Sequence, residues 1–582
     1  MSISSFIFFS LPFENFTVLS AFGVMSNVRK STRIIMKAEI YLAQCVESAL
    51  KQAYDTEAKV VIEKPRQEAW GDFATTVALG LAKSLRTAPR VIADKIVENI
   101  KDEAHLLDKI TVDGPGFINF TLSKSHWQSS VREIIGAGEK HGNDTWGNGK
   151  KINIEFVSAN PTGPLNVVSA RAAATGDVLV ELLNKVGFAA EREYYINDAG
   201  RQIRLLGASV AARYLTLCGK NTAVPDEGYQ GEYVIGLAEQ LKAEHGEEFV
   251  ELDDLERNAR LSKLALEKMV ALHKKVMEEY RVNYHTWFYE SSLRKKDVHF
   301  KIVDELKSKN LTYEKDGALW FKSSEFGDAK DRVLVTKEGE PTYFMVDIAY
   351  HQDKFERGFE TLYDLWGPDH HGYIDRVSAA MQALGYAKEK FNVRIIQQVN
   401  MLRDGELVKM SKRAGNIIEM NEVVQEVGID AARFFFVMRK LDSPLDFDID
   451  LAKKRSDENP VYYVQYAHAR IVNVIQFANE NGLELSLDAD LSLLEANEEI
   501  ALIRKLNEFP TVIGACARLM EVHHLPAYLM EVAAAFHSFY HNNRVVTDDR
   551  KLSEARMMLL EATRCVLLNG LKILRISAPD RM

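Results

Sequence analysis

Apolar residues recur at helical spacing soon after the start of the chain. Between residues 36 and 54 they return every three or four positions, which predicts an amphipathic helix. Three patterns follow: a strand-like run at residues 59–65 that a proline ends, two helical stretches divided at Pro89 within residues 70–100, and a strand pattern at residues 110–122 that Gly114, Pro115 and Gly116 interrupt. Together they predict a compact α+β domain over residues 36–123.

The middle of the chain alternates between short apolar runs and helical patterns. An apolar run at residues 152–157 leads into a turn rich in glycine and proline, a helix to about Val186 and a second extended run at residues 190–196. This order forms a βαβ unit, which implies a parallel sheet. Further strand-like runs follow at residues 332–336, 362–367 and 393–399. We therefore predict an α/β fold with a Rossmann-like parallel-sheet domain over residues 150–430.

Two other stretches lack this alternation. Residues 197–331 are mostly charged and helical, as an insertion in a sheet domain would be. After Asp430 no strand signal appears, and amphipathic patterns such as residues 459–480 and 530–543 predict helices. We expect an all-α helical bundle over residues 431–582.

The amino-acid composition is typical of a globular protein with buried hydrophobic cores. Of 582 residues, 46% are hydrophobic and 27% charged, and 83 acidic against 73 basic residues give a net charge of −10. Any contact with nucleic acid must therefore come from local basic patches. The four cysteines form no CxxC pair, which favours a reducing, cytoplasmic setting over a zinc ribbon or disulfide framework. No apolar run reaches the roughly 18 residues of a membrane span.

Residues 1–35 do not read as a secretory signal. No basic residue precedes their short apolar stretch, and Pro12, Glu14 and Asn15 interrupt it. We expect translation to begin at Met36, which would make residues 1–35 a mis-assigned extension. A transit peptide is the alternative, because acidic residues are few.

The stretch NPTGPLNVVSARAAATGD at residues 160–177 predicts an anion site at a helix start. Pro164 suits the first turn of a helix, where exposed amides and the helix dipole favour a phosphate. Asn166 and Ser169 lie three residues apart, so both can donate to a phosphate oxygen. The alternative is that they only cap the helix. The sequence contains no GxxxxGK[ST] loop.

A second stretch, LVKMSKRAGN at residues 407–416, concentrates positive charge. Lys409, Lys412 and Arg413 surround the small residues Ser411 and Gly415, which suits a loop that clamps a triphosphate. A solvated basic loop is the alternative reading of this stretch alone.

Taken together, the two stretches resemble the paired signature sequences of class I aminoacyl-tRNA synthetases. Segments from Met36 to Met582 resemble one family, the arginyl-tRNA synthetases, in the family's order. The segments are GDFATTVALGLAK, GPGFINF, EFVSANPTGPL, YYINDAG, LWGPDHHGY, KMSKRAGN, GIDAARFFF, NPVYYVQYAHARI and APDRM. The resemblance implies an arginine–tRNA ligase, which activates arginine with ATP to arginyl-adenylate and transfers it to the 3′ end of tRNA(Arg).

The resemblance also implies an ATP site, with Mg²⁺ arriving on the nucleotide. Lys409, Lys412, Asn166 and Ser169 would act in catalysis. The full set expected at ATP is Pro161, Gly163, Pro164, Asn166, Ser169, Gly367, Asp369, His370, His371, Lys409, Met410, Ser411 and Lys412. Two adjacent histidines on an extended segment point apart, so we expect no metal site at His370 and His371.

Arginine requires carboxylates, because a guanidinium presents a planar fork that a carboxylate meets with two charge-assisted bonds. Tyr343 and Asp347 lie four residues apart, on one face of a predicted helix. The resemblance assigns them to the guanidinium, and Glu155 and Asn160 to the rest of the amino-acid site. A plain surface charge is the alternative for Asp347. Because arginine is large and distinctive, we expect no editing site in the insertion.

The ends of the chain would contact tRNA. By resemblance, residues 36–122 face the outer corner of tRNA and the helical bundle binds the anticodon. Four aromatics could stack on unpaired bases, although most aromatics at helical spacing belong to a core: Tyr462, Tyr463, Tyr466 and Phe539. We select Tyr463 and Tyr466, with Arg544 and the cluster Lys453–Arg455 as phosphate contacts. A monomer is expected by analogy.

One signature departs from the family. Where His-X-Gly-His is usual, this chain has Asn166, Val167, Val168 and Ser169, and Ala172 stands where a second glycine is common. One reading is a working enzyme that uses the shorter donors of Asn166 and Ser169. The other is a catalytically inactive tRNA-binding relative. The retained lysines and carboxylates favour the enzyme.

Overall fold

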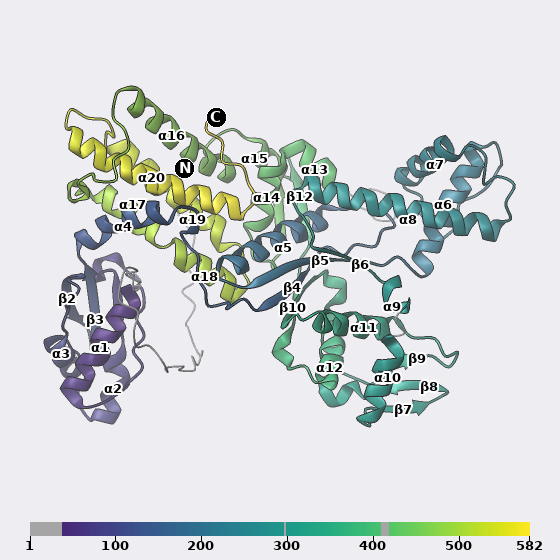
Figure 1. The fold of residues 1–582 in the computed structure, drawn as a ribbon, viewed down its shortest axis with the longest axis horizontal. Helices are drawn as coiled ribbons and strands as arrows, with labels where there is room; N and C mark the ends of the chain where they lie inside the picture. The colour runs from purple at the N-terminus through teal and green to yellow at the C-terminus, as the bar shows by residue number, and fades with distance from the viewer. Residues whose placement is uncertain (1–37, 296–297, 409–417) are drawn as a thin grey trace. The chain divides into compact units, whose positions relative to one another are not determined.

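The computed structural model describes residues 38–295, 298–408 and 418–582, and these form two compact units that meet at Ser123 and Lys124 (Figure 1). The N-terminal extension and the signature residues Lys409, Met410, Ser411, Lys412 and Arg413 lie outside the described residues. Each unit is described by itself.

The first unit is a three-stranded antiparallel sheet with helices. The strand order is β1-β3-β2. Its elements are α1 (Ala38–Tyr54), η1 (Glu68–Trp70), β1 (Phe73–Thr75), α2 (Val77–Leu85), α3 (Pro89–Asn99), β2 (Leu107–Asp113) and β3 (Phe117–Leu122). The strand predicted at residues 59–65 is wrong, since Glu63 makes only a single bridge to Ala74. Val61 is half exposed and Pro65 has no N–H for a ladder, so this run neither buries a face nor extends its pairing.

The second unit is built around a five-stranded parallel sheet. Its order is β11-β10-β4-β5-β6, so the chain runs outward from β4 to one edge and later fills the other side. This is the Rossmann order 3-2-1-4-5, which confirms the predicted fold class. The strands are β4 (Lys151–Glu155), β5 (Ala189–Ile196), β6 (Thr286–Tyr289), β10 (Thr361–Trp366) and β11 (Phe391–Ile395).

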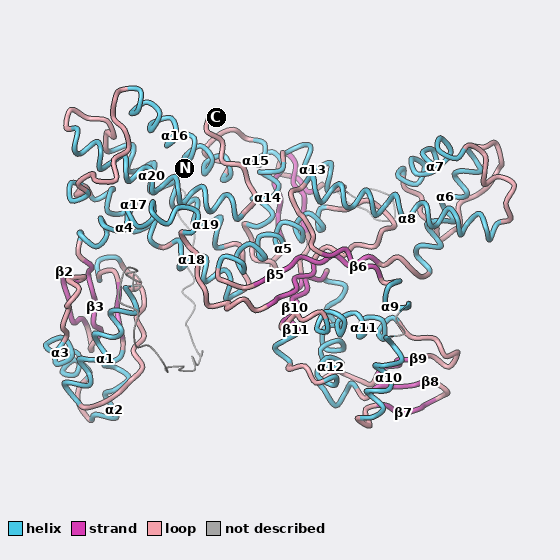
Figure 2. Tube along the Cα trace, viewed as in Figure 1, coloured by secondary structure: helices cyan, strands magenta, loops and turns pink. Residues whose placement is uncertain are grey.

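Helices cover both faces of this sheet (Figure 2). Helix α5 (Val167–Lys185) packs against β4 and β5, and it is buried along almost its whole length. Gly176 allows this close packing, because a Cβ there would lie 2.3 Å from the ring of Phe156. Helices α11 (Tyr343–Glu356) and α12 (Ile374–Leu384) pack against β10 and β11.

The predicted insertion is helical only in its first part. Helices α6 (Arg201–Leu217), α7 (Glu232–His245) and α8 (Asp254–Glu279) enclose their own apolar core. The chain then rejoins the central sheet at β6 and forms a separate antiparallel sheet; the prediction of a helical segment missed β6 and the first two strands of the separate sheet. A strand of four residues is too short to give a periodic signal. The run predicted at residues 332–336 is a strand, but it pairs in this antiparallel sheet instead of the parallel one. The added elements are α9 (Ser291–Lys295), α10 (Val298–Ser308), β7 (Thr312–Lys315), β8 (Ala318–Phe321) and β9 (Arg332–Val335).

A small sheet, β13-β12-β14, follows the central one. Its strand β14 contradicts the expectation that no strand follows Asp430: Leu445 pairs with Val399 in parallel register. Only Leu445 and Phe447 are buried in β14, so its alternation is too brief to detect in the sequence. The elements here are β12 (Val399–Arg403), β13 (Glu406–Leu407), α13 (Met420–Val427), α14 (Ile429–Val437), β14 (Leu445–Asp448) and α15 (Ile449–Lys453).

The C-terminal part is a helical bundle, as predicted, and the earlier helix α4 (Lys124–Ala137) packs with it. The helices are α16 (Pro460–Glu480), α17 (Asn497–Asn507), α18 (Phe509–Leu519), α19 (His524–Asn542) and α20 (Arg550–Ile573). Short 3-10 turns connect elements elsewhere: η2 (Gly138–Lys140), η3 (Ser323–Phe326), η4 (Pro368–Tyr373), η5 (Lys388–Lys390) and η7 (Leu491–Leu493). Among the described residues, no helix combines the length and apolarity that a membrane span requires.

Candidate active site

The candidate site lies where the strand order of the central sheet reverses, between β4 and β10. In open parallel sheets, ligands bind beyond the carboxyl ends of the strands at this point. The loop after β4 leads into α5, and the loop after β10 forms η4. Because β4 and β10 are paired neighbours, both loops leave the same edge of the sheet.

The helix behind the first signature begins later than predicted. Helix α5 starts at Val167, so Pro164 precedes the first turn instead of occupying it. Asn166 is the N-cap: its Oδ1 accepts from the amides of Val168 at 3.0 Å and Ser169 at 3.1 Å. Asparagine is favoured at the N-cap position because its side-chain oxygen accepts hydrogen bonds from amides that have no partner within the helix. Its Nδ2 amide is then the group through which Asn166 can donate to an anion.

Ser169 contributes to this cap. Its hydroxyl lies 3.4 Å from Oδ1 of Asn166, and the residue is buried, with 9% of its surface exposed. In the structure the hydroxyl of Ser169 therefore lies against the side chain of Asn166.

Helices of the insertion hold the signature turn from outside. The Tyr233 hydroxyl, on α7, donates to the carbonyl of Thr162 at 2.7 Å. His273, on α8, has Nε2 at 2.8 Å from the carbonyl of Gly163 and Nδ1 at 3.0 Å from the Tyr194 hydroxyl. Facing a carbonyl, Nε2 acts as the donor. Burial lowers the pKa of His273, which favours this neutral form.

The chain that follows the second signature is fixed beside the first. The amide of Met420 donates to the carbonyl of Leu165 at 2.8 Å, and Asn166 forms an antiparallel bridge with Glu419. Glu419 and Met420 are thus held by backbone contacts beside the N-terminus of α5.

The residues predicted for adenosine lie on η4 and just before it. Gly367 is half-buried, and Asp369, His370 and His371 are exposed. The prediction of an extended segment is wrong, because Pro368 begins a 3-10 turn in which a fixed proline φ is favourable.

Glu155, at the end of β4, is held through both carboxylate oxygens. Oε1 accepts from the hydroxyl of Ser158 at 2.8 Å, and Oε2 accepts from the ammonium of Lys354 at 2.5 Å. The chain then bends sharply, because Val157 (φ 69°) and Ser158 (φ 38°) adopt left-handed conformations. Such a φ is strained for a β-branched valine, and strain of this kind persists where surrounding contacts enforce it. One such contact is the amide of Tyr195, which donates to Oγ of Ser158 at 3.0 Å.

Tyr343 and Asp347 lie one turn apart on α11, as predicted. Tyr343 is exposed and Asp347 is half-buried. The pKa of Asp347 is raised to about 6, chiefly by burial and also by the negative charges of Glu155 and Glu290, while His351 and a hydrogen bond from Tyr373 act to lower it. A pKa raised by neighbouring carboxylates marks a place that favours a cation. Asn160 is exposed at the start of the turn.

Glu290 was missed by the sequence analysis. It follows β6 and is buried, and the hydroxyl of Tyr195 donates to its carboxylate at 3.0 Å. Burial raises the pKa of Tyr195, and the negative charges of Glu290, Asp347 and Glu155 add to the rise. Glu290 ends its strand as Glu155 does, so recognising β6 would have revealed it.

Beneath these carboxylates lies a network of buried ions. The ammonium of Lys354 lies 3.0 Å from Asp364 on β10, in addition to its bond to Glu155. Nε2 of His351 lies 2.8 Å from the same aspartate. Glu193, on β5, accepts from the two terminal guanidinium nitrogens of Arg357. The sequence signal was a stripe of polar residues at helical spacing along α11.

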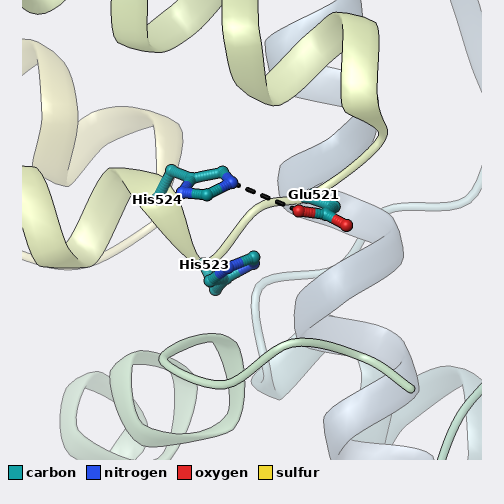
Figure 3. A group of neighbouring side chains, drawn as sticks. All are labelled: Glu521, His523 and His524. Carbon is teal, nitrogen blue, oxygen red and sulfur yellow. Dashed lines mark hydrogen bonds and ion pairs between the residues drawn. The ribbon is translucent and has the colours of Figure 1, made fainter. Parts of the chain in front are cut away.

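Two groups of side chains in the described ranges have metal-ligand geometry. The first is Glu155, His351 and Asp364, where the ammonium of Lys354 already bonds both carboxylates. The second is Glu521, His523 and His524, with Nε2 of His524 3.2 Å from Glu521 (Figure 3).

The second group also carries a cation. The ammonium of Lys440 lies 3.0 Å from Glu521, and the N-terminus of α19 contributes further positive charge through the helix dipole. Neither group therefore presents the uncompensated negative charge that a metal ion would neutralise.

The residues predicted for tRNA line two adjoining depressions on α16 and α19, of about 790 and 840 Å³. Tyr466 lines both, Tyr463 lines one and the exposed Arg544 lines the other. Arg470 places its guanidinium 4.9 Å from the rings of Tyr466 and Tyr540. Phe539 is fully buried, so its stacking on a base is excluded and the alternative of a core aromatic is correct.

The flanking basic cluster is exposed but partly paired. Lys453 forms an ion pair with Glu426 and Lys454 one with Glu458, whereas Arg455 lines the larger depression.

Comparison with known proteins covers nearly the whole chain. Three family models match in succession: the arginyl tRNA synthetase N terminal domain at residues 41–122, the class I (R) tRNA synthetase catalytic domain at residues 130–442, and the DALR anticodon binding domain at residues 464–582.

Full-length relatives agree. An arginine–tRNA ligase of Carboxydothermus hydrogenoformans is 47% identical over 92% of this chain and 97% of its own length. Arginine–tRNA ligase 1 of Halalkalibacterium halodurans is 44% identical over 94% of this chain and 98% of its own length. The structure of Thermus thermophilus arginyl-tRNA synthetase shares the fold, with a TM-score of 0.72 at 21% identity over 94% of this chain and 100% of that one. The chain therefore belongs to the arginyl-tRNA synthetase family of class I synthetases.

Proposed function

We propose that this chain is an arginine–tRNA ligase that activates arginine with ATP and transfers it to the 3′ end of tRNA(Arg). The observation that carries the proposal is that carboxylates surround Tyr195 near the end of β4: its hydroxyl donates to Glu290, and its amide donates to the Ser158 hydroxyl that bonds Glu155. The charge of Asp347 also acts on this phenol, and the chain leads from Glu155 into the turn before α5. Carboxylates suit the cationic amino acid, and a helix N-terminus suits the phosphates of ATP.

The amino-acid half of the crevice receives arginine. Asp347 and Glu290 face the guanidinium, with the hydroxyl of Tyr343 at its rim, and Glu155 and Asn160 hold the end that carries the α-ammonium. Arginine brings two positive charges, which offset the negative charges of these carboxylates.

The nucleotide half receives ATP. Backbone groups of Pro161, Gly163 and Pro164 and the amide of Asn166, with Ser169 behind it, lie along the phosphates. The adenosine contacts come from Gly367 and η4: Asp369, His370 and His371. Lys409, Met410, Ser411 and Lys412 complete the triphosphate contacts in this proposal, and the two lysines neutralise the departing pyrophosphate.

The reaction needs no side-chain nucleophile. A carboxylate oxygen of arginine attacks the α-phosphorus, the new O–P bond forms, and the bond to pyrophosphate breaks. A hydroxyl of the terminal tRNA ribose then attacks the arginyl carbonyl, and AMP leaves. The protein contributes placement and charge stabilisation.

Mg²⁺ enters on the phosphates of ATP in this proposal. Glu155, Asp347 and Glu290 belong to the amino-acid half of the crevice, and the two groups of metal-ligand geometry in the described chain already hold lysine ammonium groups. The ion shields phosphate charge when bound.

The helical bundle binds the anticodon in this proposal. Tyr463 and Tyr466 offer stacking faces and Arg544 a phosphate contact, in depressions large enough for unpaired bases. The free cysteines fit a cytoplasmic enzyme, and we assign it as a monomer by analogy with the family.

Aminoacylation tests the proposal directly. Purified protein with ATP, labelled arginine and tRNA(Arg) should yield arginyl-tRNA. Binding of the tRNA without product at any enzyme concentration would instead establish the inactive tRNA-binding relative. All reactions should contain tRNA, because family behaviour suggests that adenylate formation requires it.

A further inference from the structure

Lys354 is a fully buried cation between two strands of the central sheet. Its ammonium lies 2.5 Å from Glu155 on β4 and 3.0 Å from Asp364 on β10, and its side chain has no exposed surface. The ring of Tyr350 lies 4.5 Å from the same nitrogen. Removing an ammonium from water costs several kcal/mol, which paired carboxylates offset only with close geometry.

The surroundings of Lys354 lock Glu155 in one orientation. The ammonium holds Oε2 and the Ser158 hydroxyl holds Oε1, so the carboxylate cannot rotate without losing a bond. Ser158 is itself fixed by the amide of Tyr195. The carboxylate that ends β4 therefore owes its position to a residue on α11, almost two hundred residues later in the chain.

Lys354 also separates two negative charges. Without it, Glu155 and Asp364 would face each other in the protein interior, and one of them would take up a proton. The other titratable groups here are Glu193 on β5 and His351 on α11, whose Nε2 lies against Asp364 and whose Nδ1 lies against the carbonyl of Asp347. Two carboxylates and one lysine thus form a single electrostatic unit.

We propose that Lys354 is a positioning residue for arginine: it fixes the orientation and the negative charge of Glu155 so that this carboxylate can hold the amino-acid substrate. Lys354 itself does not touch substrate. This inference rests on the proposed role of Glu155 in binding arginine.

The test is Lys354→Met, which keeps length and removes charge. We expect the KM for arginine to rise by about 30-fold or more, with the KM for ATP within about threefold of its normal value. The acidic limb of kcat/KM for arginine should also move to higher pH, since one carboxylate of the pair now needs a higher pH to ionise. Lys337→Met, at an exposed lysine of the same unit, is the matched control and should change none of these values.

A second variant separates charge from packing. In Lys354→Met/Asp364→Asn one carboxylate is neutralised, so Glu155 keeps its charge, and we expect the acidic limb to return toward the wild-type pH with about tenfold recovery in the arginine KM. If Lys354→Met does not fold, Lys354→Arg should retain the wild-type acidic limb while raising the arginine KM.

The outcomes are distinguishable. Equal losses for arginine and ATP, or an unmoved acidic limb, would overturn the role of Lys354 and leave it a purely structural ion. If Glu155→Gln leaves the arginine KM unchanged in an active enzyme, the proposed role of Glu155 fails first. If Glu155→Gln raises that KM and Lys354→Met does not, only the present inference fails.

Discussion

The proposed nucleotide half and the proposed amino-acid half of the site are assembled by different physical means. In the described part of the nucleotide half, hydrogen bonds between backbone groups and uncharged side chains fix the conformation of the turn. They are the Asn166 cap and the bonds of Tyr233 and His273 to carbonyls of the turn. In the amino-acid half, buried ion pairs fix the side chains, since Lys354 bonds both Glu155 and Asp364. Neutral hydrogen bonds fix a shape, whereas buried ions fix both a shape and a charge.

This difference predicts how strongly substitutions in each half should weaken substrate binding. Loss of a neutral hydrogen bond costs about 1–3 kcal/mol when it leaves a buried partner unsatisfied. Loss of one member of a buried charge pair costs about 2–5 kcal/mol and changes the protonation of what remains. Substitutions in the amino-acid half should therefore have the larger effects and the stronger dependence on pH.

The largest effect is expected from Asp347→Asn. The substitution keeps the shape of the side chain and removes the charge that meets the guanidinium, so we expect the arginine KM to rise by about 100-fold or more with little change in the KM for ATP. Steady-state aminoacylation measures both values. Asp304→Asn, at an exposed aspartate on α10, is the control. An unchanged arginine KM in Asp347→Asn would show that the specificity pocket lies elsewhere.

His273→Phe should affect the other half. It removes the donor that holds the carbonyl of Gly163 and keeps an aromatic ring on α8, so we expect about a tenfold loss of kcat/KM for ATP. The arginine KM should stay nearly constant. Tyr233→Phe, which removes the bond to Thr162, should give a loss of the same kind. Equal losses for both substrates would remove the distinction between the two halves.

A pH profile should sharpen the contrast. The pKa of Asp347 is raised to about 6, so its ionised form is lost as the pH falls through that value. The groups that face it are His351, Tyr373, Glu155 and Glu290. A guanidinium binds the ionised form, so kcat/KM for arginine should fall by about tenfold per pH unit below pH 6. The KM for ATP, measured at saturating arginine, should show no matching limb at that pH.

The smallest effects are expected at the helix cap. Asn166→Ala removes the cap and should lower the free energy of unfolding by about 1 kcal/mol, with a further loss in ATP use if Nδ2 contacts phosphate. Ser169→Ala removes only a weak bond to Asn166 and should change stability by less than about 0.5 kcal/mol. Denaturant unfolding and ATP kinetics measure the two parts separately. A larger effect of Ser169→Ala on kcat would show that its hydroxyl reaches the nucleotide.

Much of the candidate site could be proposed from the sequence because its motifs lie within short stretches, and the roles of these residues stay predictions. The turn at residues 160–166 and the pair Tyr343 and Asp347 are local patterns, and the structure brings them to one end of the sheet. The capping role of Asn166 was an open alternative, and only the observed start of α5 decided it. Glu290 was missed because β6 is short and lies inside a segment that reads as helical.

The amino-acid sequence was enough to identify the βαβ unit at the start of the central sheet, the helical C-terminal bundle and the resemblance to one family, because periodic apolar spacing and contiguous motifs are local properties of the chain. Only the tertiary structure decided which groups meet. His273 reaches Gly163, and Lys354 reaches Glu155, across more than a hundred residues of chain. Such contacts depend on how strands pair and helices pack, which short-range spacing does not encode.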